Sequence, residues 1–381
     1  RRASLVVHQK GDEQDAGVHS LTLRWLSPTG EELWTWNPQV DKGYGPSNVD
    51  IDAIRDGLGV GGGPSLRLLY DVCLAGEDLQ KEFVSVTLPV GPGGRWLPSD
   101  PGRRALSGEI DRLPEGEGRV SDSIRNLIDA APEVCFPIVH GTWGEDGTLQ
   151  GLLEILDLPY VGAGVAASAV AMDKVLAKRL LEAAGVPVVE YETATARELE
   201  TGLDLFLGRC RSLGSPLFVK PRIGGSSVGV RRVGPEDGPD ALADAVRFAL
   251  RFDDAVLVER GVVGRELECA VLGDERLEAS MVGEIKPGKD FYDYEDKYVS
   301  DTAELIAPAE LPDEVAEEIR ELAPRAFAAV GGSGMARVDF LLDGGRPYVN
   351  EINTLPGFTS ISMYPKLWEL SGVPLPELVS T

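Results

Sequence analysis

Two runs of residues near the carboxyl end, joined by a short turn, constrain the fold more than any other feature of this chain. Residues 336–342 and 347–353 read as strands on either side of Asp343-Gly344-Gly345-Arg346. Successive residues of a strand point to opposite faces. Two carboxylates, an amide and a guanidinium can therefore converge, because the following pairs each share a face of one strand: Arg337 with Asp339, and Glu351 with Asn353.

The side chains of this hairpin suit a magnesium site. Carboxylate and amide oxygens are hard ligands, and Mg²⁺ is usually held by one or two protein carboxylates together with waters and substrate phosphates. An arginine fixed beside them can stabilise charge that develops on a transferring group. Spacing alone leaves an alternative open, in which the same residues form the solvent-facing side of an ordinary hairpin.

A second segment, residues 222–229, is rich in glycine and serine. Small side chains there allow backbone N–H groups to approach a phosphate closely. The segment lacks the Gly-Lys-Ser/Thr ending of a Walker A loop and precedes a strand instead of a helix, so a P-loop fold is disfavoured. Taken by itself, such a hairpin tip is more often a plain turn.

Several charged residues stand at the ends of predicted elements. Lys220 and Lys297 lie on separate elements and can clamp a polyphosphate. Glu259 and Glu266 flank a strand end, where a carboxylate can accept from ribose hydroxyls. His140 follows an apolar run and precedes a helix, which is the position of the ligand crevice in open α/β sheets. For each of these residues alone, a structural or solvated side chain is the alternative.

The apolar pattern predicts a mixed α/β chain. Leu5–Val7 and Cys135–Val139 suit buried strands. One helix is expected from about Leu149 until Pro159, and another over 168–184, where Lys174 lies beside the apolar stripe and ordinarily snorkels. The remaining predicted elements are strands at 217–220, 228–230, 255–258 and 267–272, a helix over 315–330 that Pro324 kinks or breaks, and an extended loop at 91–122.

Length and charge narrow the class of protein. A chain of 381 residues exceeds one typical hydrophobic core, which predicts two or three domains. Lys plus Arg number 37 against 62 Asp plus Glu, and the net charge of -25 repels nucleic acid and anionic membrane surfaces. With no apolar stretch of about 18 residues and no signal-peptide core, we expect a cytoplasmic protein without membrane insertion. The four cysteines form no CxxC pair, which predicts reduced structural thiols.

Taken together, the motifs between about His140 and Val379 resemble the D-alanine:D-alanine ligase family of the ATP-grasp superfamily. They follow the family order: His140-Gly141-x-x-Gly144-Glu145-Asp146-Gly147-Thr148, Met172-Asp173-Lys174, Val219-Lys220-Pro221, Gly225-Ser226-Ser227-Val228-Gly229, Tyr292-Asp293-Tyr294-Glu295-x-Lys297-Tyr298 and Asn350-Glu351-Ile352-Asn353-Thr354-x-Pro356-Gly357. The resemblance implies an α/β (α+β) ATP-grasp fold with nucleotide between the central and carboxy-terminal sheets. It implies three domains, at residues 1–162, 163–257 and 258–381.

The resemblance also implies the ligands of the nucleotide and of the metal. ATP is expected to contact Lys174, Lys220, Ser226, Ser227, Glu259, Arg260, Val262, Glu266 and Lys297. Two Mg²⁺ ions, which Mn²⁺ can replace, are expected at Asp339, Glu351 and Asn353. The amino acid substrates are expected to meet His140, Glu145, Ser362 and Met363.

The implied reaction forms an acylphosphate from the first amino acid, which the amine of the second then attacks. Arg337 and the Gly357 N–H are expected to stabilise the oxyanion, and His140 is a further catalytic candidate. Ser226 and Tyr298 are expected to lock a mobile loop over the site. The amino terminus departs from the family, and Asp15 or Glu13 is the candidate for the carboxylate that binds the first substrate's ammonium group.

The expected product is D-alanyl-D-alanine for peptidoglycan synthesis, made by a homodimer that acts on small amino acids and binds no nucleic acid. Lys297-Tyr298 is the pairing found in dipeptide-forming members, which favours an amine acceptor over a hydroxy acid. Two alternatives stay open. One is an ATP-grasp ligase for another amino acid pair in a specialised pathway, and the other is a non-catalytic ATP-binding scaffold.

Overall fold

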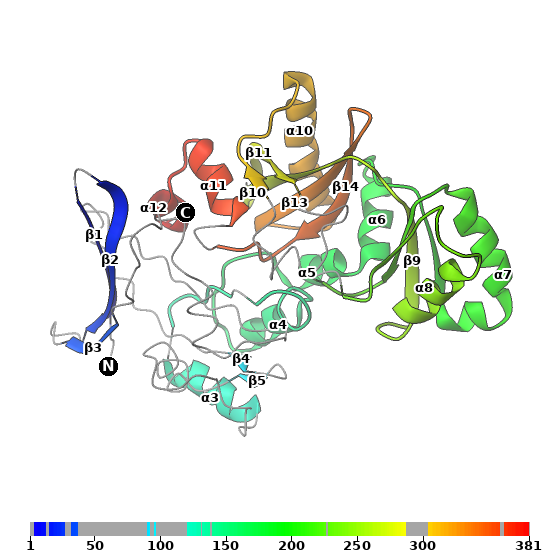
Figure 1. The fold of residues 1–381 in the computed structure, drawn as a ribbon. Helices are drawn as coiled ribbons and strands as arrows, with labels where there is room; N and C mark the ends of the chain where they lie inside the picture. The colour runs from blue at the N-terminus through cyan, green and yellow to red at the C-terminus, as the bar shows by residue number, and fades with distance from the viewer. Residues whose placement is uncertain are drawn as a thin grey trace. The chain divides into compact units, whose positions relative to one another are not determined.

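The chain is a mixture of helices and antiparallel sheets that divides into two compact units (Figure 1). The computed structural model describes residues 4–12, 15–26, 32–36, 90–91, 95–96, 120–130, 132–137, 139–225, 228–286, 304–358 and 362–380. The first unit consists of Arg1–Ile138, Phe358–Pro365 and Val373–Thr381, and the second of Val139–Gly357 and Lys366–Gly372. Among the helices in these ranges, none combines the length and apolarity needed to cross a membrane.

The first unit contains an antiparallel sheet of order β1-β2-β3. Its described elements are β1 (Ser4–Asp12), β2 (Asp15–Leu26), β3 (Glu32–Trp36), β4 (Val90–Gly91), β5 (Arg95–Trp96), α3 (Val120–Ala130), the start of α11 (Met363–Leu370) and α12 (Leu375–Ser380). The strand predicted at Leu5–Val7 lies within β1. The strand predicted at Cys135–Val139 is wrong for its described residues, where Cys135 makes one bridge only. Pro137 lacks the N–H that a ladder requires.

The loop predicted over 91–122 mostly falls at residues that the structure leaves undescribed, 92–94 and 97–119. Its described parts belong to β4, β5 and α3. The three cysteines within the described ranges are all free thiols: Cys135, Cys210 and Cys269. Burial raises the pKa of Cys210 and of Cys269 to about 12, as expected for structural thiols.

The second unit begins with a four-stranded antiparallel sheet of order β6-β9-β7-β8. Its elements are β6 (Tyr191–Thr195), α7 (Ala196–Ser212), β7 (Leu217–Pro221), β8 (Arg231–Val233), α8 (Ala241–Ala249) and β9 (Ala255–Arg260). Leu217 and Val219 of β7, with Val256 and Val258 of β9, share a buried core with α7 and α8. Alternation therefore places Lys220 and Glu259 on the opposite face.

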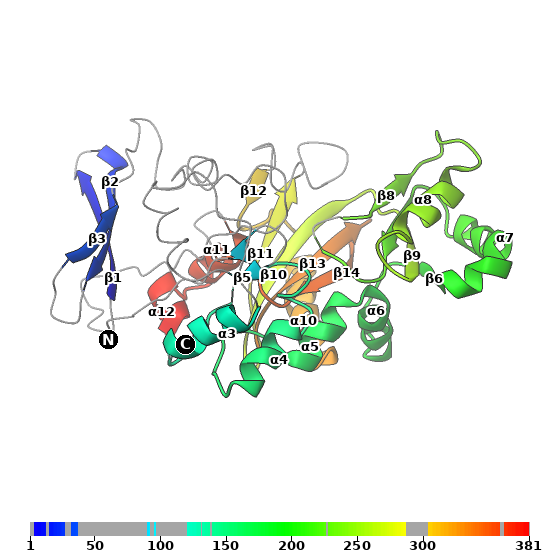
Figure 2. The ribbon, with the colours of Figure 1, turned by 90° about the horizontal axis from the view of Figure 1, so that it is seen from below.

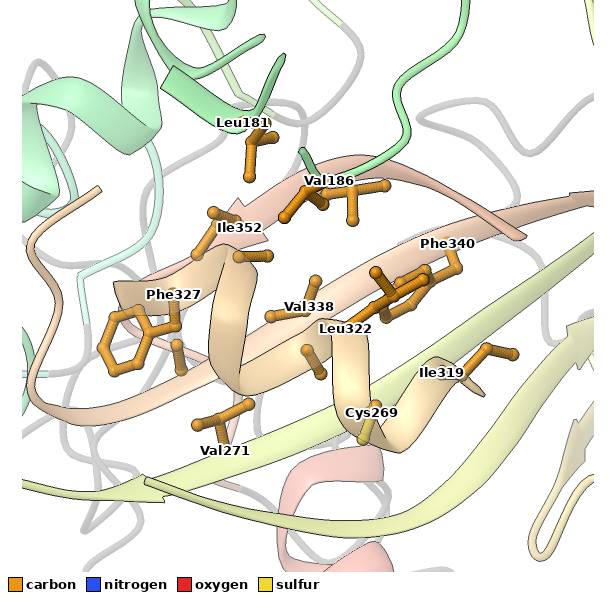
Figure 3. Close-up of a cluster of buried hydrophobic side chains, with 14 of the residues drawn as sticks. Leu181, Val186, Cys269, Val271, Ile319, Leu322, Phe327, Val338, Phe340 and Ile352 are labelled. Carbon is orange, nitrogen blue, oxygen red and sulfur yellow. The ribbon is translucent and has the colours of Figure 1, made fainter. Parts of the chain in front are cut away.

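This unit also contains a five-stranded antiparallel sheet of order β12-β11-β10-β13-β14 (Figure 2). Its elements are β10 (Arg265–Gly273), β11 (Glu278–Lys286), β12 (Glu304–Ile306), α10 (Asp313–Ala329), β13 (Gly334–Asp343) and β14 (Arg346–Asn353). Figure 3 shows Leu322 and Phe327 of α10 packed over Val338 of β13 in a core that also contains Cys269. The predicted hairpin of residues 336–353 is confirmed, and its polar residues lie on the face away from α10.

Three shorter helices precede the sheets, α4 (Thr148–Ile155), α5 (Val165–Met172) and α6 (Lys174–Ala183). The single helix predicted over 168–184 is wrong, because Asp173 ends α5 in extended conformation and caps α6 by accepting from the N–H groups of Val175 and Leu176 at 3.0 Å. Lys174 thereby becomes the first residue of α6.

Two further predictions differ in detail from the observed elements. The strand predicted at 228–230 starts later, at Arg231, since Val228 donates to the Gly225 carbonyl at 3.1 Å and Gly229 has φ +77°. The helix predicted over 315–330 is confirmed as α10, and Pro324 lies inside it without dividing it.

Candidate functional site

The polar hairpin of the five-stranded sheet carries a group of three acids around one arginine, which we call the carboxylate cluster: Glu268, Arg337, Asp339 and Glu351. Asp339 pairs with Glu351 across β13 and β14 and with Glu268 across β13 and β10. Arg337 pairs with Asn353 in the same ladder. The alternation that the sequence predicted has therefore brought Arg337, Asp339, Glu351 and Asn353 to one face of the sheet.

Arg337 is held by two acids within the carboxylate cluster. Its Nε and Nη2 each donate to an oxygen of Asp339 at 2.7 Å, and Nε lies 3.0 Å from Glu268 Oε1. Burial by itself lowers the pKa of this guanidinium, but the charges of Asp339 and Glu268 raise the pKa well above its usual value. Arg337 therefore stays a fixed cation beside the proposed metal ligands.

The sequence did not lead us to predict a role for Glu268, whose side chain is only 5% exposed in the structure. A signal was present, because Glu266 and Glu268 alternate along β10 and must share a face. What the sequence lacked was the neighbour, since nothing local places β10 beside β13.

A second ionic group, which we call the lysine cluster, joins Lys178, Lys220 and Glu259. One oxygen of Glu259 lies 2.6 Å from Lys178 Nζ and the other lies 2.5 Å from Lys220 Nζ. Burial opposes ionisation of Glu259, but the two lysines outweigh it and lower the pKa of the carboxyl to about 2. The group therefore carries two positive charges against one negative charge, which suits an anion.

Lys220 connects the two clusters electrostatically. Burial lowers the pKa of its ammonium group, yet Glu259 outweighs this effect, with smaller contributions from Glu351 and Glu266, so the pKa is raised. Lys220 thus feels the field of Glu351 on the five-stranded sheet. Lys178 had not been predicted, although it follows Lys174 by one helical turn on α6 and so faces the same way.

The glycine-rich segment around residues 222–229 is fastened at its base to the start of α6. Lys174 donates from its backbone N–H to the Arg222 carbonyl at 3.0 Å and from Nζ to the Gly224 carbonyl at 2.5 Å. Arg222 reaches Asp254 at 3.0 Å, and the Ile223 N–H donates to Asp253 at 2.6 Å. Lys174 and this loop are therefore positioned together, as a phosphate-binding role requires.

The loop that follows His140 meets both the glycine-rich segment and β14. A Cβ placed on Gly225 would lie 3.3 Å from the Gly141 Cα, so the two loops are in close approach. Glu145 accepts from the Gly141 N–H and, with the amide of Asn353 oriented by its partners, from Asn353 Nδ2 at 2.5 Å. This orientation turns the amide oxygen of Asn353 away from Glu145. His140, which is half-buried, directly precedes this loop.

The residues expected around adenine and ribose include Arg260, Val262 and Glu266. Arg260 contacts Glu190 at 2.9 Å and Asp343 at 2.8 Å, so its guanidinium ties β9 to the β13–β14 turn. Its remaining candidate contact with a nucleotide is through the backbone. Val262 and Glu266 are half-buried, and the Gly261 N–H donates to the Pro216 carbonyl at 2.6 Å.

Other predicted residues fall outside these contacts. Ser226, Ser227, Lys297, Tyr298 and Glu13 lie outside the described residues. Asp15 is the first residue of β2, and only its backbone is described. Ser362 and buried Met363 belong to the first unit, whereas half-buried Gly357 ends the main segment of the second. Their predicted roles stay predictions.

The carboxylate cluster fits a magnesium site of the open kind. Within the described ranges, no group of three or more His, Cys, Asp or Glu side chains forms a metal cage. Asp339, Glu351 and Asn353 instead supply two carboxylates and an amide on one sheet face. This set suits Mg²⁺, which takes its remaining ligands from waters and substrate phosphates.

Comparison with known proteins identifies relatives of the chain in sequence. The family models "D-ala D-ala ligase N-terminus" and "D-ala D-ala ligase C-terminus" match residues 83–163 and 180–381, so Asp15 precedes the matched part. The D-alanine–D-alanine ligase of Solibacter usitatus is 48% identical over 303 residues, which cover 79% of this chain and 84% of the relative. That of Mycobacterium tuberculosis is 50% identical over 293 residues, covering 75% and 74%.

Solved structures of the same kind resemble the fold. The D-alanine-D-alanine ligase from Coxiella burnetii aligns with a TM-score of 0.57 and 45% identity, over 65% of this chain and 66% of that chain. The VanG D-Ala:D-Ser ligase from Enterococcus faecalis aligns with a TM-score of 0.59 and 36% identity, over 65% and 71%. The fold is the ATP-grasp fold of these enzymes, and the chain belongs to the D-alanine–D-alanine ligase family of carbon–nitrogen ligases.

Proposed function

We propose that this chain joins two molecules of D-alanine into D-alanyl-D-alanine at the expense of ATP, for peptidoglycan synthesis. The observation that carries the proposal is the placement of Asp339, Glu351 and Asn353 on one sheet face, with Lys220 in the field of Glu351. The curated relatives that carry the name D-alanine–D-alanine ligase support the choice of substrate.

The chemistry explains why anion and cation sites must be neighbours. A carboxylate is a poor electrophile because its leaving group would be oxide. In the proposed reaction the carboxylate of the first D-alanine attacks the γ-phosphate of ATP, which gives an acylphosphate and ADP. The amine of the second D-alanine then attacks the carbonyl, and phosphate leaves as the amide bond forms. Catalysis of such transfers depends on positioning and on neutralising charge.

The lysine side of the site is proposed to bind the nucleotide. Lys174 and Lys220 contact ATP phosphates, and the 225–229 loop closes over them with Ser226 and Ser227. The backbone of residues 259–262 lines the adenine, Glu266 accepts from ribose, and Lys297 adds a phosphate contact. The fixed base of the loop at Arg222 and Gly224 supports this role, because it pre-orients Lys174.

The acid side is proposed to hold two Mg²⁺ ions through Asp339, Glu351 and Asn353. Bound Mg²⁺ would neutralise phosphate oxygens and so lessen their repulsion of an attacking carboxylate. Arg337 and the Gly357 N–H would stabilise the oxyanion that develops when the amine attacks. Two acids keep Arg337 charged and in place, which supports this assignment.

The remaining assignments complete the proposal. His140 and Glu145 would face the first D-alanine, Asp15 would bind its ammonium group, and Ser362 with Met363 would hold the carboxylate of the second. Tyr298 and Ser226 would close the site against water, which would otherwise hydrolyse the acylphosphate. We further propose three domains, at residues 1–162, 163–257 and 258–381. We also propose that the protein is a homodimer, and light scattering tests this oligomeric state directly.

Release of ADP in the presence of candidate substrates tests the function. Purified protein with ATP, Mg²⁺ and D-alanine should release ADP and yield D-alanyl-D-alanine by mass spectrometry. L-alanine alone, and D-alanine with D-lactate as acceptor, are the comparators. Faster ADP release with another pair than with D-alanine would replace the proposed substrate, and the absence of ADP release with every amino acid would favour the scaffold alternative.

A further inference from the structure

The carboxylate cluster contains one acid more than the metal site uses. Glu268, Asp339 and Glu351 occupy neighbouring positions across β10, β13 and β14, on the face of the sheet away from α10. Asp339 and Glu351 are proposed metal ligands, whereas Glu268 has no assigned role. Its side chain is 5% exposed and forms an ion pair with Arg337.

Asp339 is both the ion-pair partner of Arg337 and a proposed metal ligand. In the structure both of its oxygens accept from Arg337 at 2.7 Å, as a bidentate ion pair. A metal ion bound to the same carboxylate draws on the same oxygens and repels the guanidinium. The Arg337 side chain is only 18% exposed, so the loss of a carboxylate partner would leave a largely buried charge uncompensated.

Glu268 offers Arg337 a second carboxylate partner. Its Oε1 lies 3.0 Å from Nε of Arg337. Glu268 lies on β10, which borders β13 on the side away from β14. We propose that Glu268 is a positioning residue that retains Arg337 when Asp339 turns its oxygens to the metal, so that the metal and the arginine need not compete for one carboxylate. With Glu268 the cluster has three negative charges and one positive charge, an excess that matches a divalent cation.

This inference rests on the proposed function for the identity of the metal site, but it is tested without turnover. Glu268→Gln keeps the shape and an acceptor oxygen and removes the charge. Binding of Mn²⁺ in the presence of ADP is measured from the loss of the free-ion electron paramagnetic resonance signal. We expect the affinity for Mn²⁺ to fall about tenfold, in the range seen when a group behind a metal ligand is altered.

The sheet offers a matched control for an effect on folding alone. Glu284 of β11 is equally buried, with a side chain 5% exposed, and its two oxygens bind Arg265 at 2.7 Å. It pairs with Leu267, so it lies on the opposite face of the sheet from Glu268. Glu284→Gln should lower thermal stability to a similar degree and leave Mn²⁺ binding unchanged.

The outcomes separate this inference from the proposed function. Mn²⁺ affinity in folded Glu268→Gln equal to the wild-type affinity overturns the inference, even if the wild type makes D-alanyl-D-alanine. A tenfold loss supports it, even if the wild type prefers another amino acid pair. If Glu268→Gln does not fold, Glu268→Asp is measured instead, because the shorter acid cannot reach Nε. A loss of Mn²⁺ affinity in this variant supports the inference, and an unchanged affinity overturns it.

Discussion

The lysine cluster and the carboxylate cluster are built alike but have opposite charge. Each lies at the polar face of an antiparallel sheet whose other face packs on helices, and helix α6 adds Lys178 to the lysine cluster. The lysine cluster balances two cations with Glu259, and the carboxylate cluster balances three acids with Arg337. Neither is neutral, and each therefore retains charge for a ligand of the opposite sign.

The two clusters also differ in the shape of the cation. A lysine ammonium is a compact point charge on a flexible stem, whereas a guanidinium is a planar fork that fixes its partners. Lys220 can therefore adjust to a phosphate, while Arg337 is locked by Asp339 and Glu268. The comparison suggests that one cluster binds a ligand that moves during the reaction and the other holds a fixed charge at the reacting centre.

The largest effect is expected on the acid side. Glu351→Gln should lower the rate of ADP release about 1,000-fold and leave the circular dichroism spectrum unchanged, because it removes a proposed metal ligand that the core does not use. Glu278→Gln, at an exposed position of β11, is the control and should retain wild-type turnover. Full turnover in Glu351→Gln would remove the metal assignment.

The next effect separates the two lysines of the lysine cluster. Lys220→Met should lower kcat/KM for ATP about 100-fold, as expected when a charged contact to a transferring group is lost. Lys178→Met removes the other partner of Glu259. It should leave kcat/KM within about tenfold of wild type, because the Lys178 side chain is only 3% exposed and is therefore too buried to contact the nucleotide. Steady-state kinetics with varied ATP distinguish them, and equal losses in both variants would show that the cluster acts only as a unit.

Acid should destabilise the lysine cluster through Glu259. The folded pKa, about 2, lies below the usual value of 4.5, so the stabilisation is present above pH 4.5 and is lost as the pH falls toward 2. Its full size is on the order of 3 kcal/mol. Urea unfolding of wild type and Glu259→Gln across this window should show a steeper loss of stability in the wild type. Parallel curves would mean that other carboxylates dominate.

The smallest effect is expected at an exposed ion pair that joins α7 to the four-stranded sheet. Arg209 of α7 lies 2.8 Å from Glu192 of β6, with side chains that are 45% and 28% exposed. Glu192→Gln should leave the thermal midpoint within experimental error, because solvent screens exposed charges. A clear drop would contradict the view that burial gives the two clusters their strength.

The sequence by itself predicted the hairpin of 336–353, its polar face and the motifs of the ligase family. The reason is that strand alternation is a local property, so Arg337, Asp339, Glu351 and Asn353 could be assigned to faces from their spacing. Lys174 and Lys220 came from short motifs that likewise need no knowledge of the neighbours.

Tertiary structure alone decided which charges became partners. Spacing could place Glu268 on the face of Glu266, but only the pairing of β10 with β13 brings it to Arg337. In the same way, Lys178 reaches Glu259 because α6 lies beside β9, a strand that is far away in the sequence. Asp173, where α5 ends and α6 begins, also forms a bridge to Ile223, which lies far away in the sequence. Strand order and helix packing are long-range properties, and local periodicity carries no information about them.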